Sequence, residues 1–200
     1  MNLTDIVKQL DPDWATAPIY RKGVKIPNGQ KACGKNPLGK ACHEDIKPAV
    51  TAWYLEENPE LFGACGVYTG PRSKGLVFFD ADANLAVLRQ KWGSDLEKAP
   101  YVTSAKKNAA KYFFYVPEDL WPSVCGLSHV AAGGEGFEVL WGPQGVIAGE
   151  YAGGGSYELH GDLKAIPEAP VWLLERMKAE KTKRNQHETS VVDSRYARRT

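Results

Sequence analysis

The chain has 200 residues, of which 43% are hydrophobic and 24% charged, the balance of a soluble globular protein with one domain, or one domain and a tail. Its 25 basic and 24 acidic side chains give a net charge of +1, so no strong charge field indicates a polyanionic partner. The 20 glycines and 13 prolines predict many turns, but the composition excludes a collagen, a coiled coil and a wholly disordered chain.

The sequence also indicates the compartment. No apolar run is long enough to cross a bilayer, and residues 1–5 carry neither the basic nor the apolar region of a secretory signal. Four cysteines, Cys33, Cys42, Cys65 and Cys125, are too few for a disulfide framework in a chain of this length. We therefore expect a reduced, cytoplasmic protein with no membrane partner.

The first sixty residues predict two helices separated by a basic segment. Apolar residues at helical spacing favour a helix over residues 3–10, ended by Asp11-Pro12. Residues 21–47 are basic and rich in turn signals. A second helix is predicted over residues 45–57, with Val50, Trp53 and Tyr54 on one side.

From residue 65 the pattern changes to strands. Short β-prone segments predict strands at 66–69, 76–79, 101–103, 112–116, 136–141, 145–148 and 156–159. Helices are predicted at 83–92 and 170–178, and we expect the polar residues beyond 178 to form a mobile linker or tail. Because strands outnumber helices and are interleaved with them, the predicted class is α+β with a mixed or antiparallel sheet.

Two carboxylates, Asp80 and Asp82, follow the apolar run 76–79, which is typical of a central strand. Residues two apart on a strand project from the same face, and two like charges there repel unless a cation neutralises them. Carboxylate oxygens suit Mg²⁺ or Mn²⁺. Phosphoryl transfer uses two such ions ~3.5–4 Å apart, which normally need a third carboxylate, and Glu138 is the best candidate.

Each of these carboxylates also has a structural interpretation. An Asp-x-Asp at a strand end commonly forms a turn or a helix N-cap, with Asp82 capping the helix from Ala83. Glu138 by itself is typical of the solvent-facing member of an alternating strand. Near the basic segment, Cys33, Cys42 and His43, with Cys65, leave a zinc site as an alternative.

The neighbouring sequence favours the catalytic interpretation. Residues 69–82 read Thr-Gly-Pro-Arg-Ser-Lys-Gly-Leu-Val-Phe-Phe-Asp-Ala-Asp, which resembles the first motif of the primase-polymerase (PrimPol) branch of the archaeo-eukaryotic primase superfamily. Residues 101–117 are similar to its second motif, with Lys111 where the family has His. Glu138 matches the third, where Asp is commoner, and the turns at 37–40 and 153–157 also match, so the resemblance covers roughly residues 18–170.

The resemblance implies an archaeo-eukaryotic primase fold, with an N-terminal α/β part, an RRM-like part and the active site between them. It implies template-directed transfer of nucleotides from dNTPs or NTPs to a 3′-hydroxyl, with two Mg²⁺ or Mn²⁺ ions held by Asp80, Asp82 and Glu138. Residues 1–178 would be the catalytic domain, and residues 179–200 would lead to a helicase region. DNA template and primer are the implied partners, in phage or plasmid replication.

Side chains near the carboxylates are candidates for binding the nucleotide. A triphosphate needs cations and hydrogen-bond donors, and we expect these from Ser104, Lys111, Lys106, Lys74 and Arg72. Any one of these lysines can instead be a solvated surface residue. The alternative function is a non-catalytic nucleotide- or nucleic-acid-binding module on the same fold, and a different two-metal enzyme, such as a nuclease, is a third.

Overall fold

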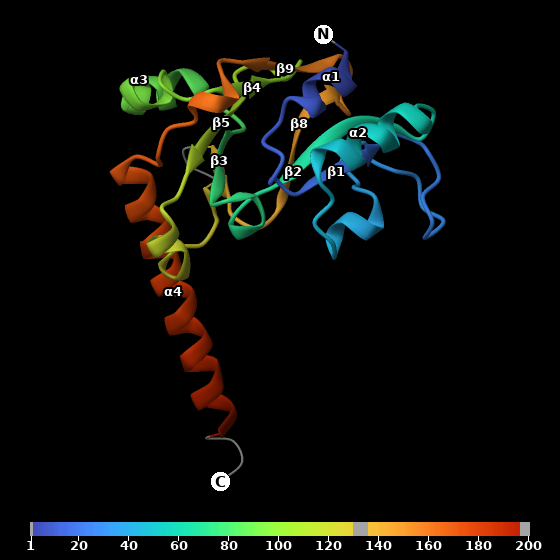
Figure 1. Cartoon of the computed structure of the whole chain (residues 1–200). Helices are drawn as coiled ribbons and strands as arrows, with labels where there is room; N and C mark the ends of the chain where they lie inside the picture. Colours follow the sequence, from blue (N-terminus) through green and yellow to red (C-terminus); the bar gives the residue numbers. More distant parts are fainter. Residues whose placement is uncertain (1, 130–135, 197–200) are drawn as a thin grey trace.

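The computed structural model describes residues 2–129 and 136–196 (Figure 1). The strands of the described residues are β1 (Thr16–Tyr20), β2 (Phe62–Tyr68), β3 (Leu76–Ala81), β4 (Tyr101–Thr103), β5 (Ala110–Tyr115), β6 (Leu127–His129), β7 (Phe137–Leu140), β8 (Gln144–Glu150) and β9 (Ser156–His160). The α-helices are α1 (Leu3–Lys8), α2 (Pro48–Glu57), α3 (Leu85–Leu96) and α4 (Val171–Tyr196). Two of the short 3₁₀ turns between them are η1 (Gly39–Cys42) and η2 (Pro71–Ser73).

The described strands form one sheet in the order β1-β2-β8-β9-β4-β5-β3-β7-β6. Neighbouring strands are antiparallel throughout. The predicted α+β class is therefore confirmed, with an antiparallel rather than a mixed sheet.

This sheet curls back on itself, so that β8 lies over one face of β3 and β5. Lys111 on β5 donates to the carbonyl of Val146 on β8 at 3.2 Å, although β9 and β4 separate these strands in the sheet order. A Cβ atom at Gly145 would lie 2.8 Å from the Phe78 ring, so only glycine lets β8 approach β3 this closely. The concave side holds a core that includes Phe78 and Phe113, whose rings meet edge to face at 4.7 Å.

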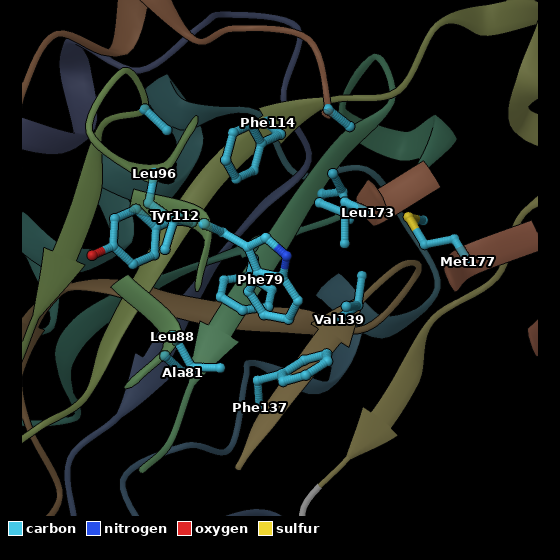
Figure 2. Close-up of a cluster of buried hydrophobic side chains, with 14 of the residues drawn as sticks. Phe79, Ala81, Leu88, Leu96, Tyr112, Phe114, Phe137, Val139, Leu173 and Met177 are labelled. Atoms are coloured by element: carbon cyan, nitrogen blue, oxygen red, sulfur yellow. The ribbon is translucent and has the colours of Figure 1, made fainter. Parts of the chain in front are cut away.

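The strand β3 lies in the interior of the sheet, between β5 and β7. Residues Leu76 to Phe79 are fully buried, because the strand has a core on each face. On the convex side, Phe79 packs with Leu173 and Met177 of α4 and with α3, as Figure 2 shows. The central strand predicted from the apolar run is confirmed.

Several elements differ from the sequence prediction. The strands β1, which contains Pro18, and β6 were not predicted. Val50 and Trp53 of α2 are 47% and 53% exposed, so the side of the helix that carries them is not its core face. The helix α3 begins after Asn84, which occupies its N-cap position, so Asp82 does not cap this helix.

The last helix is longer than predicted. It was expected to end at residue 178, but α4 runs to Tyr196 and extends away from the sheet (Figure 1). Leu173 and Met177 anchor its first turns in the convex core, and residues 182–187 are exposed. A polar sequence thus continues a helix that packing has already started. Residues 197–200 of the predicted tail lie outside the described residues.

Candidate active site

A pocket opens where the concave face of the sheet reaches the end of β3, and it brings together five of the predicted site residues. Asp80 is on β3, and Asp82 follows the strand directly. Ser104 and Lys106 lie in the turn between β4 and β5, and Lys111 is on β5. Because Asp80 and Asp82 line the same pocket, they point to the same side, as their spacing predicts.

Asp80 and Lys111 form the buried ion pair of the pocket. They lie opposite each other in the β3–β5 register, and Lys111 Nζ is 3.2 Å from Asp80 Oδ2. Their side chains are only 11% (Lys111) and 22% (Asp80) exposed. Lys111 also donates to the carbonyl of Val146, so its ammonium has two oxygen partners from two different strands. This lysine is therefore fixed in position.

Asp82 and Lys106 form a second pair at the mouth of the pocket. Lys106 Nζ is 2.6 Å from Asp82 Oδ1, and the side chains are 43% and 38% exposed. The backbone N–H of Lys106 donates to Ser104 Oγ at 3.3 Å, which holds the turn. Both aspartates thus carry a lysine partner, one buried and one in contact with solvent.

Glu138 lies beside this pocket. It is opposite Asp80 in the β3–β7 register, so the row Lys111–Asp80–Glu138 crosses three strands, and directly opposed residues share a face. Glu138 is half-buried and is not among the side chains that line the pocket. Within residues 2–129 and 136–196, no three acidic, His or Cys side chains lie together as a ready set of metal ligands.

Seven further residues that were not predicted as site residues line the pocket, and the largest of their side chains belong to Lys35, Tyr151 and Tyr157. Gln144 donates its side-chain N–H to the carbonyl of Lys35 at 3.0 Å, which ties the basic segment to β8. The rings of Tyr151 and Tyr157 meet edge to face at 5.5 Å. The pKa of the Tyr157 phenol is raised, mainly because the side chain is buried and also because Tyr151, Asp80 and Asp82 disfavour a negative charge beside them. The phenol therefore stays neutral. Tyr157 was visible only as part of the Gly-rich turn, and Lys35 as one lysine among many.

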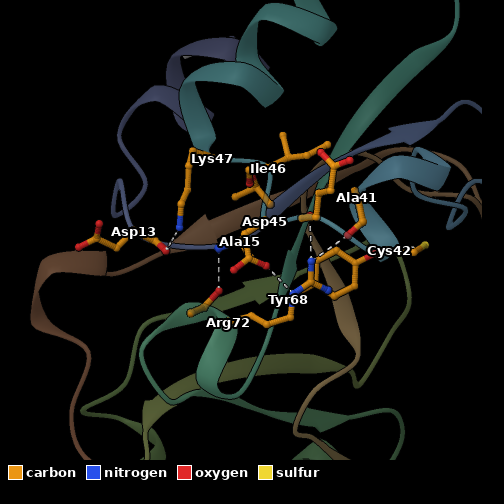
Figure 3. Close-up of polar contacts among 12 residues, drawn as sticks. Asp13, Ala15, Ala41, Cys42, Asp45, Ile46, Lys47, Tyr68 and Arg72 are labelled. Atoms are coloured by element: carbon orange, nitrogen blue, oxygen red, sulfur yellow. Dashed lines mark hydrogen bonds and ion pairs between the residues drawn. The ribbon is translucent and has the colours of Figure 1, made fainter.

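Two predicted nucleotide-binding residues, Arg72 and Lys74, lie outside the pocket. Arg72 stacks over the Tyr68 ring at 3.8 Å and donates to Asp45 Oδ1 at 2.7 Å, as Figure 3 shows. Lys74 pairs with Asp13 and Asp11 near the N-terminus. Because both side chains already bind groups of the protein, the structure gives them a role in holding loops together.

The cysteines near the basic segment are dispersed. Cys65 is fully buried, which raises the pKa of its thiol to about 12, whereas Cys33 and Cys42 are exposed. Cys42 Sγ accepts from the Tyr68 hydroxyl at 3.5 Å. Since the part of the chain described here gathers no three possible ligands, the zinc alternative finds no support in it.

No model of a known protein family matches the chain, and no curated protein sequence matches it. The likeness to primase-polymerases therefore rests on the sequence motifs. No helix of the described residues is long and apolar enough to cross a membrane. The pocket itself combines two aspartates with three lysines, and this combination of hard oxygen ligands and cations suits a polyphosphate bound with divalent ions.

Proposed function

We propose that the chain is a primase-polymerase catalytic domain that transfers nucleotides from dNTPs or NTPs to a 3′-hydroxyl on a DNA template. One observation carries the proposal: Asp80, Asp82, Ser104, Lys106 and Lys111, selected from separate motifs, line a single pocket. The pairing of β3 with β5 brings the two motifs side by side, and in each motif the side chains that the resemblance assigns to the metal ions or the phosphates line this pocket. The archaeo-eukaryotic primase fold is part of this proposal.

The donor set fits divalent ions. Asp80 and Asp82 present carboxylates to the same pocket, and Lys106, the exposed partner of Asp82, occupies a position that a stronger cation can take. Glu138, next to Asp80 across the β3–β7 register, would complete the set. Bound Mg²⁺ or Mn²⁺ would lower the pKa of the attacking hydroxyl and neutralise the triphosphate.

The protein's own side chains would position the nucleotide. Lys111, held by Val146 and Asp80, supplies a positively charged donor in a fixed position where the family has His. The Ser104 hydroxyl and Lys106 lie on the turn that precedes β5 and line the same pocket, where they could donate to the phosphates of a bound nucleotide. Lys35, from the basic segment of residues 21–47, adds a third cation to the pocket.

The wider setting follows from the same resemblance. DNA template and primer are the proposed macromolecular partners, in phage or plasmid replication in the host cytoplasm. Residues 179–200, most of which continue α4, would connect residues 1–178 to a helicase region.

The test is incorporation of labelled dNTP on a primed template with Mg²⁺ or Mn²⁺. Asp82→Asn should abolish primer extension, because it removes a metal ligand from a partly exposed position whose loss the fold tolerates. Asp119→Asn, an exposed carboxylate outside the pocket, is the matched control and should extend primers normally. Extension by Asp82→Asn at the wild-type rate would refute the assignment of the site.

One observation favours the non-catalytic alternative, a nucleotide-binding module. Both aspartates are paired with lysines, so the pocket is charge-compensated without any metal. A nucleotide titration with and without Mn²⁺ separates the two functions. Affinity that does not depend on the metal, with no primer extension, would favour the binding module.

A further inference from the structure

The two lysines that face the aspartates are held very differently. Lys111 is almost buried and bonds to oxygens on β3 and β8. Lys106 is 43% exposed, sits on a turn, and pairs with Asp82, which is itself 38% exposed. A solvent-exposed pair of this kind has a small net free energy, because water competes for both partners.

We infer that Lys106 is an exchangeable counter-ion. It neutralises Asp82 when no divalent ion is bound, and when a divalent ion binds Asp82, Lys106 moves to the triphosphate of the nucleotide. This inference rests on the proposed function, and it adds a regulatory step to that site: metal and nucleoside triphosphate would bind in a coupled order.

Competition for one carboxylate carries the first half of the inference. Lys106 Nζ lies 2.6 Å from Asp82 Oδ1, in the space that a divalent ion bound to this oxygen would need. A divalent ion has twice the charge of an ammonium, and carboxylate oxygens are its preferred ligands. The flexible four-carbon stem of lysine lets the ammonium leave while the backbone stays bonded to Ser104.

The charge of the pocket supports the second half of the inference, the move of Lys106 to the triphosphate. Without metal, Lys106 is paired with Asp82 and Lys111 with Asp80. Of the three lysines that line the pocket, this leaves Lys35 as the one outside these two ion pairs. Once Lys106 is released, the pocket gains a second available cation beside Ser104. By linkage, anything that releases Lys106 raises phosphate affinity, and phosphate binding in turn raises metal affinity.

The neighbouring residue supplies a matched control. Lys107 is exposed, carries the same charge and directly follows Lys106, but it does not line the pocket. Lys106→Met and Lys107→Met therefore change the net charge equally, and only the first removes the partner of Asp82.

The experiment measures Mn²⁺ affinity by the paramagnetic resonance signal of free Mn²⁺, first with no nucleotide. Lys106→Met should bind Mn²⁺ about two- to fivefold more tightly than the wild type, the range expected for losing an exposed ion pair as competitor. At saturating Mn²⁺, the same variant should bind dATP about tenfold more weakly, because a charge-assisted bond to phosphate is lost. Lys107→Met should leave both affinities unchanged.

The opposite signs of the two changes make the inference falsifiable. Mn²⁺ affinity of Lys106→Met that equals or falls below the wild-type value would overturn the inference, since a competitor's loss cannot weaken binding. In that case the proposed function still stands if Asp82→Asn loses Mn²⁺ binding and the wild type extends primers. A wild-type protein with no Asp82-dependent Mn²⁺ binding would overturn the proposed function and this inference with it.

Discussion

At the scale of single residues, Asp80 and Lys111 stabilise each other, because each alone would be a charge with little water around it. Their side chains are 22% and 11% exposed, and removing one partner of a buried pair leaves the other uncompensated. Asp80→Asn should therefore lower the free energy of unfolding by about 3 kcal/mol. Urea denaturation measures this loss, and a change within ~0.5 kcal/mol would contradict the buried-pair interpretation.

A second variant separates the ion pair from a general packing effect. In Asp80→Asn/Lys111→Met no charge remains unpaired, so the double variant should recover part of the stability that Asp80→Asn loses. The same reasoning explains why Asp82, and not Asp80, is the better position for testing catalysis. Its carboxylate can be changed without leaving a buried charge behind.

Among the elements, Arg72 of η2 ties the loop that contains η1 to the end of β2. Its guanidinium stacks on Tyr68, and it donates to Asp45 and to the carbonyls of Ala41 and Glu44 (Figure 3). Arg72→Met should lower the free energy of unfolding by about 1–2 kcal/mol while leaving nucleotide affinity unchanged.

The matched control for this prediction is Lys40→Met on the same loop. Lys40 pairs with Glu44 four residues away, and both side chains are more than half exposed, so the control should have little effect on stability. If Arg72→Met binds nucleotide more weakly while its stability is unchanged, Arg72 contacts the nucleotide and the structural role proposed for it is wrong.

The elements also show where sequence patterns suffice. The apolar run before Asp80 predicts a central strand, because only a strand buried on both faces is apolar at every position. The strand β1 escapes prediction because Pro18 argues against a strand, although β1 is at the sheet edge, where proline is tolerated. In α2, Thr51 and Ala52 are buried and Trp53 is exposed, so hydrophobicity alone selects the wrong face.

Prediction of the site has a similar limit. Local motifs predict Asp80, Asp82, Ser104, Lys106 and Lys111, because each lies at a strand end or in a turn with a recognisable pattern. Lys35 and Tyr151 enter the pocket only because the sheet curls and brings the basic segment and the β8–β9 turn to the end of β3. Arg72 and Lys74 lie in the motif but point away from the pocket, since tertiary partners decide where a long cationic side chain goes.

For the whole molecule, the curl joins the two ends of the sheet into one core. Cys65 of β2 packs in the concave core together with Phe78 of β3 and Phe113 of β5. Its thiol is fully buried, so a reagent reaches it only when β2 and β8 separate from β3 and β5. Labelling of Cys65 should therefore report global unfolding, whereas Cys33 and Cys42 are exposed and should react at once.

Thiol labelling at pH 8, followed peptide by peptide with mass spectrometry, tests this cooperativity. Burial raises the pKa of Cys65 to about 12 from an ordinary 9.0, so the folded protein keeps a proton that the unfolded thiol releases, and stability falls as pH rises above about 9. At pH 8 the exposed thiol is mostly protonated and reacts more slowly than the structure recloses, so the labelling rate follows the equilibrium between the closed and the open protein. Asp80→Asn should then speed Cys65 labelling about a hundredfold, the factor that corresponds to its stability loss. Cys65 labelling that is unaffected by Asp80→Asn would mean that β2 opens independently of β3, and the two ends of the sheet would then be separate folding units.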